Sequence, residues 1–174
     1  MRELANERAV VPVLCGAATI AIGVSAWRIL ERDPDAAGWA ALAAGAFLVT
    51  AGVSLRQHDR TARVVLSFAD RLFDGLLLST FAWVTRTIDP PVAAAALIAL
   101  AAGFLASYIR AKGGSLGYGI EEGIVTPILR YACFAYALLA SATWAIWAMA
   151  IVALLAAAVR ASQVAKEERT EGPS

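Results

Sequence analysis

Six apolar stretches, each close to the length that crosses a bilayer, dominate this chain of 174 residues. A transmembrane helix needs roughly 20 consecutive, mostly apolar residues. The stretches are Ala9–Trp27, Ala37–Leu55, Val64–Val84, Val92–Ile109, Ile124–Ala140 and Thr143–Val159. With 60% hydrophobic residues, the chain is more apolar than a soluble domain of this size needs to be. We therefore expect an all-α integral membrane protein: a single bundle of six transmembrane helices over residues 1–165, then a flexible polar tail over 166–174.

The boundary between the last two stretches is the least marked. Tyr131–Val159 carries no charge. As one helix it would extend about 43 Å at ~1.5 Å per residue, which is too long for a single crossing without heavy tilt. The segment Ser141–Thr143 offers the only break, so a tight helical hairpin is predicted there.

Basic residues set the expected orientation, because the cytoplasmic flanks of membrane helices are enriched in Lys and Arg. The outer loops would carry only Arg28, Arg32 and Arg86. With a cytoplasmic N-terminus, the inner segments carry Arg2, Arg8, Arg56, Arg60, Arg63, Arg110, Lys112, Arg160, Lys166 and Arg169. The tryptophans fall at the outer helix ends, where indole rings favour the interface. We expect both termini in the cytoplasm and a multi-pass protein of the plasma (cytoplasmic) membrane.

The overall charge argues against a nucleic-acid partner. The net charge is +1, and the basic residues are scattered among the loops instead of forming a run beside aromatic residues. Proteins that bind nucleic acid usually carry a concentrated basic patch. We therefore expect no nucleic-acid partner.

Ionisable residues inside the third stretch mark the candidate site, because such groups are costly at membrane depth. Asp70 and Asp74 lie one helical turn apart, on one face. Divalent cations such as Mg²⁺ prefer oxygen ligands, so the pair could bind a metal, although two carboxylates rarely complete a two-metal centre. Arg71 and Arg130 could instead pair with them in a buried cluster that orders the bundle. Both interpretations remain open from the residues alone.

Two segments resemble a known family. The sequences SFADRLFDG at Ser67–Gly75 and SYIRAKGGSLGYG at Ser107–Gly119 resemble the CDP-alcohol phosphatidyltransferases, and most closely the bacterial phosphatidylinositol-phosphate synthases. The resemblance implies six transmembrane helices, cytoplasmic termini and an active site open to the cytoplasm. It also implies transfer of a phosphatidyl group from a CDP-linked lipid to an alcohol, with release of CMP.

The first half of the family signature is altered in this chain. The signature reads D-x2-D-G-x2-A-R, and its two acids bind metal ions together with two acids of the next helix. The best alignment places Leu48 and Ala51 at these two acids. It keeps Gly52 and Arg56, and Leu55 replaces the alanine. No nearby acid on this helix could replace the two that are missing.

The second half of the signature, G-x3-D-x3-D, can be aligned in two ways. One alignment makes Asp70 the last acid, and the other makes Asp70 and Asp74 the third and fourth acids. The resemblance then implies Asp70 as the catalytic base and Asp70 with Asp74 as metal ligands. Mg²⁺ or Mn²⁺ would be the cofactor of an active enzyme, and an inactive relative would need none.

A basic stretch after the fourth apolar segment resembles the family's S-Y-x-K-A-R, in which basic side chains hold a phosphate of the acceptor alcohol. Arg110 and Lys112 are the matching residues here, and with Arg56 they are the expected substrate-binding residues. Equally, Arg110 and Lys112 could be long side chains that reach toward the membrane surface at a helix end.

The resemblance leaves two functions open. The chain could be a phospholipid synthase with an altered site, or a non-catalytic relative that binds lipid or CDP-lipid or pairs with an active paralogue. The expected partners are a membrane lipid or CDP-lipid and, because the family often forms dimers, a second copy or a paralogue. A small transporter ranks last, because few polar residues could line a pathway.

Overall fold

The structure is a computed structural model, and it describes residues 2–55, 60–118 and 125–170. The elements in chain order are α1 (Arg2–Leu30), α2 (Pro34–Ser54), α3 (Arg60–Leu72), the π-helix η1 (Phe73–Leu78), α4 (Ser79–Thr85), α5 (Pro90–Ser115), α6 (Val125–Leu139) and α7 (Trp144–Thr170). The described residues contain no strand, which confirms the all-α prediction.

The number of membrane crossings agrees with the prediction only in part. Among the described residues, four helices are long and apolar enough to cross a membrane: Val10–Leu30, Pro34–Ser54, Pro90–Ser115 and Trp144–Lys166. Pro127–Leu139 is apolar but shorter. The third predicted crossing corresponds to α3, η1 and α4, which follow one another without a break but include the charged residues of the candidate site. Six crossings therefore remain a prediction.

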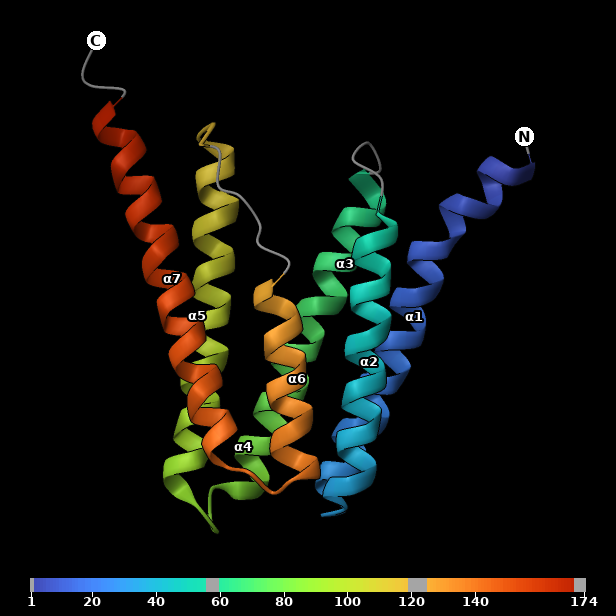
Figure 1. Ribbon diagram of the computed structural model, residues 1–174, viewed down its shortest axis with the longest axis vertical. Coiled ribbons are helices and arrows are strands. Elements are labelled where there is room, and N and C mark those ends of the chain that lie inside the picture. The colour runs from blue at the N-terminus through green and yellow to red at the C-terminus, as the bar shows by residue number, and fades with distance from the viewer. Residues whose placement is uncertain (1, 56–59, 119–124, 171–174) are drawn as a thin grey trace.

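Two Asp-Pro pairs start helices at the same end of the bundle (Figure 1). Asp33 is the N-cap of α2, and its Oδ1 accepts a hydrogen bond from the amide of Ala36 at 3.1 Å. Asp89 is the N-cap of α5, and its Oδ1 accepts from the amide of Val92 at 3.2 Å. In both cases the proline occupies the first helical turn, where its missing N–H costs nothing. The sequence thus fixes where both loops end.

The hairpin predicted near the C-terminus is confirmed. Helix α6 ends at Leu139 and α7 begins at Trp144. Ser141 reverses the chain with a φ of 49°, in the left-handed region that non-glycine residues rarely adopt. The amide of Ala142 donates to the carbonyl of Ala137 at 3.1 Å, which closes the end of α6.

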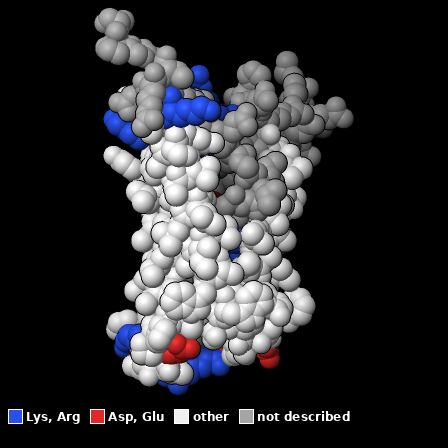
Figure 2. Space-filling model, turned by 60° about the vertical axis from the view of Figure 1, so that its left-hand side comes forward, with Lys and Arg blue, Asp and Glu red and all other residues white. Residues whose placement is uncertain are grey.

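Figure 1 shows the helices running up and down the bundle, with the start of α1 and the end of α7 at the same end. Helix α6 begins about halfway along the bundle, so its first turns lie level with the end of α3 and the middle of α5. The assignment of this end to the cytoplasm stays a prediction. On the face shown in Figure 2, Lys and Arg gather at both ends, Asp and Glu gather at the lower end, and a broad, largely uncharged belt lies between. Such a belt suits the hydrocarbon core of a bilayer.

Helix α2 approaches α6 closely because its glycines present no side chain there. A Cβ atom built on Gly45 would lie 2.8 Å from the Cβ of Tyr131, and one built on Gly38 would lie 2.6 Å from Cγ of Leu139. Small residues allow membrane helices to approach in this way. This contact fixes the position of α6, and with it the polar residues at its start.

Candidate functional site

A π-helical turn lies in the middle of the charged helix. The chain continues from α3 through η1 into α4, and Asp74 lies in η1 beside the buried ring of Phe73. Asp74 is 1% exposed, which makes it the most deeply buried charged residue among those the structure describes. Such turns contain one residue more than an α-helical turn and often occur at functional sites. The local geometry thus places an acid inside the bundle.

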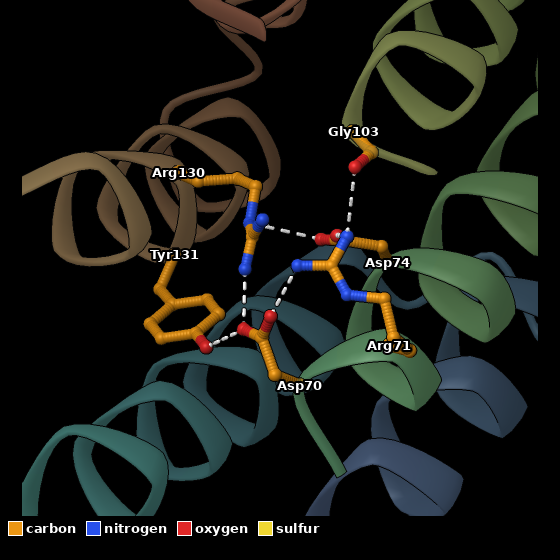
Figure 3. Close-up of polar contacts among 6 residues, drawn as sticks. All are labelled: Asp70, Arg71, Asp74, Gly103, Arg130 and Tyr131. Carbon is orange, nitrogen blue, oxygen red and sulfur yellow. Dashed lines mark hydrogen bonds and ion pairs between the residues drawn. The ribbon is translucent and has the colours of Figure 1, made fainter. Parts of the chain in front are cut away.

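Asp70 binds three donors with its two carboxylate oxygens (Figure 3). Its Oδ1 accepts from Nη2 of Arg130 and from the hydroxyl of Tyr131, both at the start of α6. Its Oδ2 accepts from Nη2 of the neighbouring Arg71. The Asp70 side chain therefore joins α3 to α6.

Asp74 makes ion pairs with the same two arginines. Its Oδ1 lies 2.9 Å from Nε of Arg130, and its Oδ2 lies 3.1 Å from Nη1 of Arg71. Neither contact has hydrogen-bond geometry, so within the described residues no donor is aligned with the Asp74 oxygens. Nη1 of Arg71 instead donates to the carbonyl of Gly103 on α5, at 3.1 Å. Attraction between unlike charges, more than aligned hydrogen bonding, holds Asp74.

These contacts form what we call the acid–arginine cluster: Asp70, Arg71, Asp74 and Arg130. Its two carboxylates and two guanidiniums cancel in charge, as buried ionised groups require. It joins α3, η1 and α6 and, through Gly103, α5 (Figure 3). The ion-pair interpretation of the sequence is thus confirmed, including the partners Arg71 and Arg130.

A large cavity of about 590 Å³ opens between α2, α3 and α6, and Asp70 forms part of its wall. Its polar lining residues are Arg63, Ser67, Asp70, Arg110 and Tyr131. The side formed by α2 is apolar: Leu48, Val49, Gly52 and Val53. This cavity therefore has one wall suited to hydrocarbon or a ring and one wall suited to an anion.

A small cavity of about 50 Å³ also includes Asp70 and Arg110 in its wall. Four arginines from four helices line it: Arg71 of α3, Arg110 of α5, Arg130 of α6 and Arg160 of α7. Ser107 contributes a hydroxyl. Converging guanidiniums at one point are typical of a phosphate or carboxylate site.

Only some of the residues predicted for the site lie together in the structure. It brings Asp70 and Asp74 together, and it places Arg110 in the walls of both cavities. Lys112 is exposed near the end of α5 and lines neither cavity. Arg56 lies outside the described residues. The roles proposed for all five remain predictions.

Sequence reasoning missed two residues of the site. The sequence motifs do not single out Tyr131, although it directly follows Arg130 and a tyrosine hydroxyl at membrane depth needs a polar partner. In the sequence, Arg160 contributes only to the expected excess of basic residues on the cytoplasmic side. Its position at the inner end of the last apolar stretch, level with Arg110, is the signal that could have identified it.

The acids of this site do not fit a two-metal centre. Leu48 and Ala51 are buried apolar residues, and α2 has no acid in the half that borders the large cavity. All four oxygens of Asp70 and Asp74 face a guanidinium nitrogen. Nowhere in residues 2–55, 60–118 and 125–170 do three His, Cys, Asp or Glu side chains gather as a metal would require.

Comparisons with known proteins bear on the fold alone. No family model matches the chain, and no curated protein matches it. Its structure resembles the crystal structure of a phosphatidylinositol phosphate synthase of Mycobacterium tuberculosis with CDP-DAG bound. The TM-score is 0.66, the sequences are 18% identical, and the match covers 92% of each chain. The resemblance seen in the sequence is therefore confirmed for the fold.

Proposed function

We propose that this chain is a CDP-alcohol phosphatidyltransferase-like membrane protein of phospholipid biosynthesis, and that its large cavity binds the head group of a CDP-linked lipid. One observation carries the proposal: two cavities share Asp70 and Arg110, one large and partly apolar, the other small and basic. A protein that joins a lipid to a phosphorylated alcohol needs two such sites side by side. The fold, shared with a synthase crystallised with CDP-DAG, supports the same substrate class.

The large cavity has the size and polarity for the donor lipid. Its volume of about 590 Å³ lies within the range of ligand pockets, roughly 300 to 1,000 Å³. Arg63 and Arg110 can face the pyrophosphate, while the apolar wall of α2 can contact the nucleoside. Arginine suits this role because its planar fork binds phosphate oxygens in pairs.

The small cavity is suited to a phosphate on the acceptor alcohol. Asp70 and Asp74 balance Arg71 and Arg130, and Arg160 adds a further guanidinium to the wall, so an anion would be favoured there. Arg110 was predicted for this role, and Arg160 joins it from α7. An acceptor held by its phosphate in the small cavity would keep its hydroxyl near Asp70.

Transfer would proceed by attack of that hydroxyl on the phosphorus bonded to the lipid. A new P–O bond forms, the bond to the CMP leaving group breaks, and the hydroxyl proton passes to a base. Asp70, in the wall of both cavities, is the residue we assign as this base. Because Arg71, Arg130 and Tyr131 occupy its oxygens, one of these donors would have to turn toward substrate first.

A second candidate is binding without transfer, alone or together with an active paralogue. It is favoured by Leu48 and Ala51, which stand where the family signature has acids. Without those acids, the departing CMP loses the metal charge that the resemblance implies. A dimeric state and a plasma-membrane location belong to the proposal in either form.

The deciding experiment measures CMP release and lipid binding with one preparation. Protein in vesicles is supplied with CDP-diacylglycerol and a panel of alcohols and alcohol phosphates, with Mg²⁺, Mn²⁺ or a chelator. CMP release that disappears in Asp70→Asn but persists in Arg86→Gln supports transfer. Arg86 is a matched control, because it is exposed and packs on Trp83 at the other end of the bundle. Binding without CMP release favours the second candidate, and no binding at all refutes both.

A further inference from the structure

The oxygens of the acid pair are already occupied in a way that leaves no position for a cation. Each of the four oxygens of Asp70 and Asp74 lies against a nitrogen of Arg71 or Arg130. A divalent cation needs several oxygen ligands at short distance, so it would have to displace both guanidiniums. Their displacement would leave the two buried guanidiniums without counter-charges, next to the positively charged cation.

The two arginines are held in place by other contacts. Arg130 lies near the start of α6, beside Tyr131, whose Cβ and ring carbons lie close to Gly45 of α2. Arg71 donates to the carbonyl of Gly103, and its guanidinium lies 5.9 Å from the centre of the Phe104 ring. The arginine side chains are also mostly buried, with exposures of 21% for Arg71 and 12% for Arg130. The cluster is therefore preorganised before any ligand arrives.

The surroundings add positive charge, which repels a cation and attracts an anion. Within the acid–arginine cluster the charges cancel, but Arg110 and Arg160 also face the small cavity. A cation in that cavity would lie among four guanidiniums and the Asp70 carboxylate. A phosphate entering the same cavity would find its counter-charge already in place.

We propose that Arg71 and Arg130 replace the divalent cation in this protein, so that it binds phosphate-bearing ligands, CDP-linked lipids among them, without a metal. The choice of ligand rests on the function proposed above, whereas exclusion of the metal rests on the cluster itself. Arg71 and Arg130 neutralise the two acids, as a cation would, and Arg110 and Arg160 place further guanidiniums in the wall of the small cavity. This explains how Leu48 and Ala51 can stand in place of acids without leaving the ligand phosphates unbalanced.

The test has one arm without ligand and one with it. In the first, Mn²⁺ alone is added to the protein in neutral vesicles, and bound Mn²⁺ is measured by electron paramagnetic resonance. We expect the free Mn²⁺ signal of Asp70→Asn, Arg86→Gln and the unaltered protein to be the same.

In the second arm, binding of CDP-diacylglycerol is measured with Mg²⁺ and with a chelator. We expect the two affinities to agree within about twofold, or ~0.4 kcal/mol.

Two arginine variants then test which groups replace the metal. Arg130→Gln removes a charge-assisted contact and should weaken lipid binding about tenfold or more, in chelator and in Mg²⁺ alike. Should Arg130→Gln fail to fold, Arg160→Gln tests the small cavity from outside the acid–arginine cluster, and it should weaken binding of an alcohol phosphate in chelator and in Mg²⁺ alike. Arg86→Gln should bind as the unaltered protein does.

The outcomes separate this proposal from the proposed function. Mn²⁺ that binds and is lost in Asp70→Asn, or lipid binding that disappears in the chelator, overturns the proposal while leaving the function intact. Unchanged lipid affinity in a folded Arg130→Gln, or unchanged affinity for the alcohol phosphate in Arg160→Gln, also overturns it. Failure to bind CDP-diacylglycerol in either buffer refutes the proposed function, and this proposal with it.

Discussion

Replacing Arg130 by methionine tests the energetics of the acid–arginine cluster. Arg130 is the only member of the cluster that comes from a helix distant in sequence, and its guanidinium contacts both Asp70 and Asp74. Methionine keeps the unbranched part of the side chain, out to about the position of Nε, and removes the charge. The variant leaves two carboxylates with one guanidinium, and Asp74 is 1% exposed. The net charge of the cluster therefore becomes negative inside the bundle.

The magnitude follows from the burial and the distances. The contact of 2.9 Å between Nε of Arg130 and Oδ1 of Asp74 brings the two charges close together. At a charge separation of about 4 Å the attraction is ~4 kcal/mol for an effective dielectric constant near 20. Removing one partner of a buried ion pair costs ~3–5 kcal/mol, because the other charge is left uncompensated. We expect Arg130→Met to lower the free energy of unfolding by about this amount.

A double-mutant cycle separates the pair from the rest of the substitution. Arg130→Met is combined with Asp74→Asn, which restores the balance of one acid and one arginine. The double variant should be more stable than the sum of the two single effects predicts, by ~1–3 kcal/mol. Each protein is unfolded with sodium dodecyl sulfate from mild detergent micelles, and the loss of helix is followed by circular dichroism. Arg86→Met serves as the control and should leave the unfolding curve nearly unchanged.

Additivity within about 0.5 kcal/mol would refute the reasoning, because residues that do not interact give additive effects. An Arg130→Met variant as stable as the unaltered protein would refute it more directly. Either result would mean that the side chains do not meet as Figure 3 shows them.

Three further predictions use the same unfolding assay. Gly45→Ala should cost ~1–3 kcal/mol, since its Cβ would lie 2.8 Å from the Cβ of Tyr131, and Gly16→Ala, with no atom within 4 Å of the new Cβ, is the harmless control. Tyr131→Phe removes a donor to the Asp70 carboxylate and should cost ~1.5–3 kcal/mol, and an unchanged midpoint would contradict that hydrogen bond. Asp89→Ala removes the N-cap of α5 and should cost ~1 kcal/mol, whereas Asp89→Asn should retain most of the stability.

Features that depend on local sequence could be predicted. The hairpin at Ser141 follows from an uncharged segment too long for one crossing, and the Asp-Pro pairs mark the starts of α2 and α5. The pairing of Asp70 and Asp74 with arginines follows from the high cost of unpaired charges at membrane depth. Each of these features depends on the length of an apolar segment, on a few neighbouring residues or on charge, all of which can be read from the sequence.

Features that depend on packing could not be predicted. The π-helical turn of η1 has a mostly apolar composition, and its amino-acid sequence does not distinguish it from an α-helix. The start of α6 halfway along the bundle decides that Tyr131 reaches Asp70, and it results from the fit of α6 against the glycines of α2. Arg160 joins the small cavity only because α7 lies beside α5. Such positions arise from contacts between segments far apart in the chain.

The π-helical turn has a consequence for how this helix can change during evolution. A wider turn corresponds to one inserted residue, and at 3.6 residues per turn its deletion would rotate everything after it by about 100°. The charged residues of α3 would keep their orientation while the lipid-facing surface of α4 turned to a new one. A one-codon insertion or deletion at Phe73–Leu78 can therefore alter the helix after the π-helical turn without rebuilding the helix before it.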